Sequence, residues 1–160
     1  MLSSTSSTSA TVGGLRHAAE YPIGQAVEVG MRDPIDLREA LSGKSPADLS
    51  TDPLEKIRAA GAHLGPFDAG DITLGHFKGT TPWERHVEGD ELFHVLDGEL
   101  HVTLLHTDDD GCDEFTVPTG AVFVVPRGRW HRAVANEPVK LLTLRSTDHG
   151  PVSFEDDPRG

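Results

Sequence analysis

The segment PWERHVEGDELFHVLDG, residues 82–98, gathers imidazole and carboxylate groups at short spacings. His86 follows Glu84 by two residues, Glu91 comes five residues later, and His94 three residues after that. Histidine and glutamate are common protein ligands of divalent transition metals. Because a mononuclear site needs about three or four protein ligands, the segment predicts either a metal centre or a charged hairpin whose acids face solvent.

Strand alternation decides which of these side chains share a face. In a strand over residues 91–96, Glu91, Phe93 and Val95 lie on one face, and His94 lies on the other. A carboxylate at the head of an inward apolar row is costly unless it is paired or bound to a metal. We therefore expect Glu91 to be either paired or bound to a metal, and His94 to belong to the outer face or to a dimer contact.

The elements around this segment are short apolar or alternating runs separated by Gly, Pro and Asp. The runs cover residues 72–77, 91–96, 99–105, 115–117, 121–125, 130–136 and 139–145. Such spacing predicts an all-β sandwich or barrel. The pair Asp97-Gly98 between two runs gives the strongest hairpin signal in the chain.

Short helices are expected before the strands. Residues 35–41 favour one helix, and a second is predicted with Asp52 as its N-cap, Pro53 in the first helical position and Gly61 at its end. The predicted organisation has four parts, which are a flexible tail (1–14), an N-terminal extension with short helices (15–65), a barrel (66–147) and a C-terminal tail (148–160).

Composition limits the classes of function. The formal net charge of −12 over 160 residues argues against nucleic acid as a partner, because phosphate binding needs a basic face. Cys112 is the sole cysteine, so an intramolecular disulfide and a thiolate zinc cluster are both excluded. The N-terminus does not read as a secretory signal, and no run approaches the length of a membrane span. We expect a cytoplasmic protein without a membrane partner.

A second motif lies downstream, where residues 120–136 read GAVFVVPRGRWHRAVAN. The order Gly, five residues, Pro, one residue, Gly, two residues, His resembles the second motif of the cupin family. Gly120, Pro126, Gly128 and His131 occupy its positions, and Asn136 stands one place later than the family's asparagine.

The first segment resembles the first cupin motif. Glu91 and Gly98 hold its last two positions, His86 holds its second histidine, Glu84 replaces its first histidine, and Gly79 is one residue closer than usual. The resemblance covers residues 70–146 and implies a small single-domain cupin of the conserved-barrel type, with a jelly-roll barrel around one divalent metal. Its implied ligands are Glu84, His86, Glu91 and His131, and the implied metal is Fe, Mn, Ni or Zn.

Replacement of the first histidine by Glu84 leaves three interpretations open. All four side chains can bind the metal, which gives a site of roughly zero net charge. Alternatively, Glu84 stands off the metal as a catalytic general base, and His86, Glu91 and His131 form a two-histidine, one-carboxylate set. In the third interpretation, Glu84 marks a metal site that has been lost.

The resemblance implies a metal-dependent enzyme, an oxidoreductase of dioxygenase type ahead of an isomerase or lyase, acting on a small organic molecule. The alternatives are a ligand-binding or sensing cupin without turnover and a structural dimerisation domain. The candidate pocket residues are His76, Phe93, Val95, Phe123 and Val125. A homodimer is expected, because both faces of the strand at 91–96 are apolar, although residues 15–65 could also cover the outer face.

Overall fold

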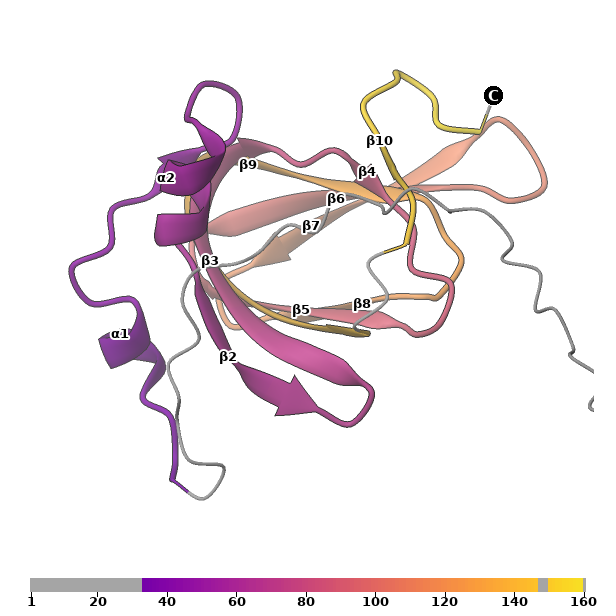
Figure 1. Ribbon diagram of the computed structural model, residues 1–160. Coiled ribbons are helices and arrows are strands. Elements are labelled where there is room, and N and C mark those ends of the chain that lie inside the picture. Colours follow the sequence, from indigo (N-terminus) through magenta and orange to yellow (C-terminus); the bar gives the residue numbers. More distant parts are fainter. Residues whose placement is uncertain (1–32, 147–149, 160) are drawn as a thin grey trace, which may run out of the picture.

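The computed structural model describes residues 33–146 and 150–159. The predicted tail at 1–14, the first part of the predicted extension and the predicted boundary between 147 and 148 lie outside these residues. The described strands form two walls that enclose a common interior, with the two short helices beside β3 and β9 (Figure 1). This architecture confirms the predicted all-β jelly roll.

One strand, β9 (His131–Ser146), runs through both walls and joins them. The strands of the first wall are hydrogen-bonded in the order β8 (Val122–Val125), β5 (Glu91–Asp97), the second half of β9, β3 (Gly70–Thr80) and β2 (Ala62–Phe67). In the second wall the order is β7 (Cys112–Pro118), β6 (Glu99–Leu105) and the first half of β9, which also pairs with β4 (Trp83–Glu84).

The hairpin predicted at Asp97-Gly98 is wrong in its pairing. Strand β5 pairs with β8 and β9, whereas β6 pairs with β7 and β9, so the turn carries the chain from one wall to the other. Gly98 has φ 88°, and an added Cβ would lie 2.9 Å from the Pro138 carbonyl oxygen. The glycine signal therefore marks a crowded left-handed turn, while the true hairpin joins β6 and β7.

The predicted alternation in β5 is confirmed. Glu91, Phe93 and Val95 are 2%, 5% and 0% exposed, whereas the residues between them are half-buried. The inward side chains of both walls form one core, which consists of Phe93, Val95, Leu100, Val102, Leu104, Val117, Val125, Ala133, Ala135, Val139 and Leu141. This core fixes the orientation of β5 and therefore the direction in which Glu91 points.

A second apolar cluster covers part of the outer face of the first wall. Leu41 and Leu64 from the N-terminal segment pack with Leu74 of β3, and Leu96 and Leu142 lie against them. Two covers were considered for this face, the chain's own N-terminal segment and a second subunit. The N-terminal segment therefore covers at least part of it.

The N-terminal segment contains the two short helices that the sequence predicts, together with strands that were not predicted. Helices α1 (Leu37–Ala40) and α2 (Leu54–Ala59) are both short. Strand β1 (Ala47–Asp48) pairs parallel with β3, and β2 begins in this segment and ends beyond its predicted boundary at residue 65.

The predicted cap of α2 is wrong. Pro53 is extended with ψ 155°. The Asp52 carboxylate accepts hydrogen bonds from the Asp48 amide and from Lys56 Nζ. The helix therefore begins one residue later, and two local partners, each four residues from Asp52 in the sequence, occupy the expected capping group.

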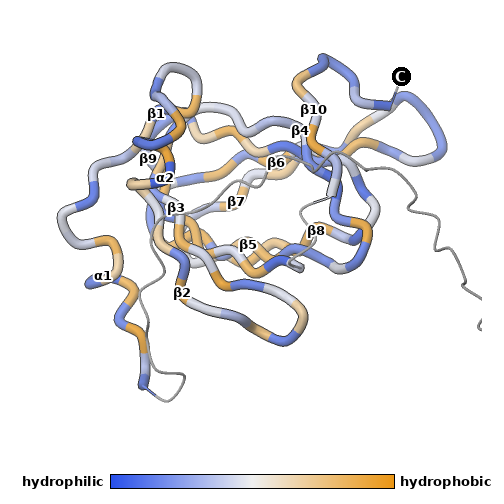
Figure 2. Tube along the Cα trace, viewed as in Figure 1, coloured by the Kyte–Doolittle hydropathy of each residue, from blue (hydrophilic) through white to orange (hydrophobic). Residues whose placement is uncertain are grey.

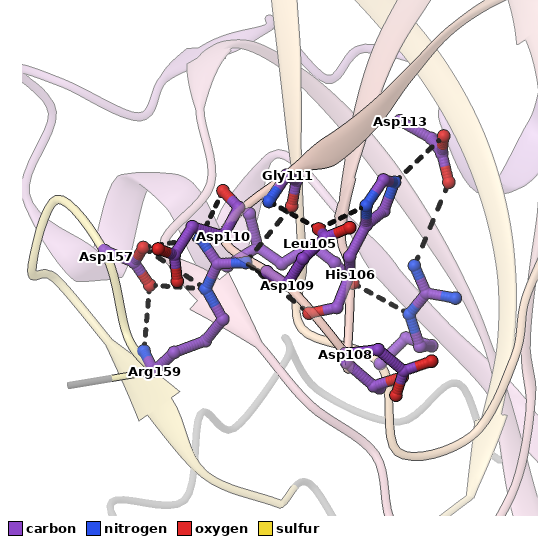
Figure 3. Close-up of polar contacts among 11 residues, drawn as sticks. Leu105, His106, Asp108, Asp109, Asp110, Gly111, Asp113, Asp157 and Arg159 are labelled. Carbon is purple, nitrogen blue, oxygen red and sulfur yellow. Dashed lines mark hydrogen bonds and ion pairs between the residues drawn. The ribbon is translucent and has the colours of Figure 1, made fainter.

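The described part of the predicted C-terminal tail is attached to the barrel. Strand β10 (Val152–Ser153) pairs antiparallel with β4. Beyond it, the Arg159 guanidinium donates hydrogen bonds to the carbonyl oxygens of Asp109, Asp110 and Gly111 at 2.8, 3.0 and 3.1 Å, and Asp157 accepts from the same guanidinium (Figure 3). Arg159 thus holds the backbone of the loop between β6 and β7.

Hydropathy follows this architecture. Figure 2 shows hydrophobic residues along the strands and hydrophilic residues in the loop between β6 and β7. Within the described ranges, no helix is both long and apolar enough to cross a membrane.

Candidate metal centre

The four predicted ligands come from three strands and one turn, and the fold brings them together. Glu84 lies on β4 and pairs with His131, the first residue of β9. Glu91 begins β5, and His86 lies between β4 and β5. One donor atom from each of these residues lies within 4.8 Å of the other three. Glu84, Glu91 and His131 each lie at the end of a strand, and His86 lies in the connection between β4 and β5.

Three of the four donors form a tight group. Oε2 of Glu91 lies 3.1 Å from Nε2 of His86 and 2.9 Å from Nε2 of His131, and all three residues are 2% exposed. Metal–ligand bonds of about 2.1 Å at right angles place neighbouring donors about 3 Å apart. The spacing of these donors therefore fits a shared divalent metal ion.

Contacts with the chain help to position both histidines. Nδ1 of His131 lies 3.3 Å from the Arg129 carbonyl oxygen. A proton on Nδ1 leaves the Nε2 lone pair directed at the cluster, as in metal-binding histidines. The Gly128 amide donates to the His86 carbonyl at 2.6 Å, so the second motif also fixes the backbone of the first.

Glu84 lies at the edge of the group. Its carboxylate is 22% exposed, and Oε2 is 3.7 Å both from Nε2 of His86 and from Nη1 of Arg145. These distances exceed the usual range of a hydrogen bond. Glu84 therefore occupies a position between the three-donor group and the Arg145 guanidinium.

The protonation of the group without a metal follows from its contacts. Burial lowers the pKa of His86, but the carboxylates of Glu84 and Glu91 outweigh burial and raise the pKa to about 9. Burial likewise raises the pKa of Glu91, but hydrogen bonds from His131 and His86 hold that pKa well below its usual range. A buried imidazolium–carboxylate pair results, and a metal ion would take the place of its proton.

A cavity of about 240 Å³ adjoins the group. Glu84, Glu91 and His131 are among the residues that line it. Much of the remaining lining comes from β3, from β9 and from residues in and before α2, and it includes Leu49, Leu54, Ile57, Arg58, Phe77 and Arg145. The donors are therefore accessible to a small molecule.

Two of the five predicted pocket residues line this cavity. Phe93 and His76 both line the cavity. Nδ1 of His76 also lies 3.2 Å from the Lys44 carbonyl oxygen. Val95, Phe123 and Val125 do not line it. Val95 and Val125 are buried in the core.

Phe123 packs against the Phe115 ring at a centroid distance of 4.9 Å. The prediction for these three residues was wrong because side chains from both walls fill the barrel beyond Phe93.

Sequence reasoning missed two arginines of the cavity. Arg145 continues the inward alternation of Val139, Leu141 and Thr143, and this signal could have placed it. Arg58 comes from α2, whose position over the cavity no local pattern indicates.

Comparisons with known proteins agree with the fold. The sequence model of the family described as "Cupin domain" matches residues 75–145. No curated protein matches the chain. A crystal structure of a protein from Neisseria meningitidis is 17% identical and covers 72% of this chain and 100% of its own, with a TM-score of 0.53.

Two further structures are more partial matches. A cupin-2 domain protein from Shewanella frigidimarina is 23% identical and covers 54% of this chain and 78% of its own, with a TM-score of 0.46. A cupin superfamily protein from Desulfitobacterium hafniense is 24% identical and covers 55% of this chain and 76% of its own, with a TM-score of 0.46. The matched residues lie within the jelly roll, so residues 75–145 of this chain form a cupin domain.

Proposed function

We propose that this protein is a metal-dependent enzyme that acts on a small organic molecule, with His86, Glu91 and His131 as its metal ligands. The observation that carries the proposal is the convergence of three buried donor atoms at 2.9 and 3.1 Å beside a cavity. Imidazole and carboxylate ligands without thiolate suit Fe, Mn, Ni or Zn.

Dioxygenase-type chemistry is favoured over isomerase or lyase chemistry. A divalent metal held by two histidines and one carboxylate supplies a Lewis acid with open coordination positions, which iron uses to bind O₂ and substrate. The protein contributes the apolar side chains of Phe77 and Phe93, which limit the access of water to the cavity.

Glu84 is assigned as the general base in this proposal. Its carboxylate lines the cavity, and it stands outside the group of three close donors. A partly exposed carboxylate at that position can accept a proton from a substrate bound in the cavity. This assignment selects the second of the three interpretations that the sequence left open.

Elemental analysis of untagged protein purified without chelator tests the proposal, with the double variant His86→Ala/His131→Ala as the comparison. We expect near one equivalent of a transition metal in the native chain and none in the variant. Iron would direct the next assay to oxygen consumption, and another metal to isomerase and lyase substrates. Absence of metal from the native chain even after reconstitution would refute the proposal.

A second candidate is a cupin that binds or senses a small ligand without turnover. It is favoured by the hydrogen bonds between Glu91 and both histidines, because these pair the Glu91 carboxylate with the two Nε2 atoms without a metal ion. This candidate predicts that ligands raise the melting temperature of metal-free protein and that no product forms.

A further inference from the structure

Arg145 places a guanidinium in the cavity beside the donor group. Its side chain is 13% exposed, and its Nη1 lies 3.7 Å from Oε2 of Glu84. Its buried Nε has no hydrogen-bond partner within the part of the chain that the structure describes. Arg145 lines the same cavity as Glu84, Glu91 and His131.

These contacts leave the hydrogen-bonding capacity of the Arg145 guanidinium largely unused. A guanidinium carries five N–H donors in a planar fork, and the contact with Glu84 is longer than the usual hydrogen bond of about 2.7–3.2 Å. A buried charged donor without a partner is unfavourable. An oxygen anion in the cavity would satisfy this fork, and a carboxylate matches it with two parallel hydrogen bonds.

A second guanidinium reaches the cavity from α2. Arg58 lines it, and its buried Nε also has no hydrogen-bond partner among the described residues. A divalent metal would offset the charges of Glu84 and Glu91. The two arginines would then leave the cavity positively charged, so that it attracts an anion.

The apolar residues of the lining indicate which kind of molecule fits the cavity. Leu49, Leu54, Ile57, Phe77 and Phe93 present apolar surface to the cavity. The cavity volume of about 240 Å³ lies below the ~300–1,000 Å³ typical of sites for drug-sized molecules. These features select a small molecule with an apolar body rather than a bare inorganic anion.

We propose that the substrate is a small carboxylic acid with an apolar body, whose carboxylate is bound by Arg145 and whose body lies against the apolar lining. The inference rests on the proposed function, because the Arg145 site positions the acid beside His86, Glu91 and His131. Arg58 contributes the second positive charge.

Calorimetric titration of the full chain loaded with Zn(II) tests this inference. The probes are hexanoate and benzoate, their neutral amides hexanamide and benzamide, and inorganic phosphate. We expect each carboxylate to bind at least about tenfold more tightly than its amide, as expected of charge-assisted hydrogen bonds, and phosphate to bind more weakly than either carboxylate.

Three variants locate the effect. Arg145→Met removes the charge with little change in length, and it should abolish the preference for carboxylate over amide. Arg145→Lys keeps the charge without the fork and should retain part of that preference. Arg38→Met makes the same change in net charge at an exposed position on α1 and should leave the preference intact.

Metal content, measured on the same samples, separates this inference from the proposed function. Equal binding of carboxylate and amide by metal-loaded wild type would overturn the inference alone, as would unchanged preference in a folded Arg145→Met or Arg145→Lys variant. Tighter binding of phosphate than of either carboxylate would also overturn the inference. Failure of wild type to hold metal would refute the proposed function, and titration of that metal-free protein would then decide the inference separately.

Discussion

Oε2 of Glu91 lies 2.9 Å from Nε2 of His131, although 40 residues separate these two side chains in the sequence. The contact joins the two motif segments in the interior of the barrel. It forms because Glu91 begins β5 and His131 begins β9, and both strands direct those residues inward. The predictions that follow depend on this contact, on its neighbours and on the surfaces of the same barrel.

Glu91 and Glu84 should differ in their effects on metal binding. We expect Glu91→Gln to lower metal affinity by more than about 100-fold, because it removes a carboxylate from the three-donor group. Glu84→Gln should keep the metal and lose turnover, because Glu84 lies outside that group. Chelator competition measures the affinities, and a matching loss of metal in Glu84→Gln would show that Glu84 is an essential ligand.

Metal-free protein should become less stable as the pH rises from about 6.5 to about 9. The folded-state pKa of His86 is about 9, above the reference value of 6.5, so its charge stabilises the fold fully below 6.5 and loses that effect as the pH rises through 9. Melting temperatures across this range measure the decline.

His86→Gln should flatten this decline in melting temperature. Hydrogen bonds to Asp113 and Asp109 also raise the pKa of His106. Loss of the His106 charge with rising pH would therefore lower the stability in the same direction as loss of the His86 charge. His106→Gln is therefore the matched control. An equally steep decline in wild type and in His86→Gln would contradict the prediction for His86.

Arg159 should control the order of the loop between β6 and β7. Its guanidinium binds the carbonyl oxygens of Asp109, Asp110 and Gly111. Arg159→Ala should speed hydrogen exchange of the loop amides while leaving the barrel strands protected. Arg127→Ala serves as the control, because the Arg127 side chain is 70% exposed. Unchanged exchange in Arg159→Ala would show that the loop holds its conformation without this contact.

The expected homodimer can be tested at β8. Val122 and Val124 are 56% and 49% exposed on the outer face of this strand, away from the N-terminal segment's cluster. Exposed apolar side chains that lie together favour association. The double variant Val122→Asp/Val124→Asp should shift a dimer to a monomer in light scattering, whereas Phe154→Asp, at another exposed apolar position, should not. A native monomer would contradict the expectation.

The sequence predicted the local features of this protein well. Alternation in residues 91–96 placed Glu91, Phe93 and Val95 on the inward face, and motif spacing selected the four residues whose donors converge. The first signal is local, because side chains in a strand alternate between faces whatever its partners are, whereas the second rests on the resemblance to the two cupin motifs.

Tertiary structure decided the features that depend on distant partners. The Asp97-Gly98 turn looked like a hairpin, but β5 and β6 each pair with β9 in different walls.

Tertiary structure also determined which side chains line the cavity. Val95 and Val125 share the inward direction of Phe93, yet side chains from the opposite wall bury them. Alternation sets the direction of Arg145, and only the packing of α2 over the barrel brings Arg58 to the same cavity. Local pattern thus determines the face of the strand on which a side chain lies. Long-range strand pairing determines which residues that side chain contacts, because the paired strands lie far apart in the chain.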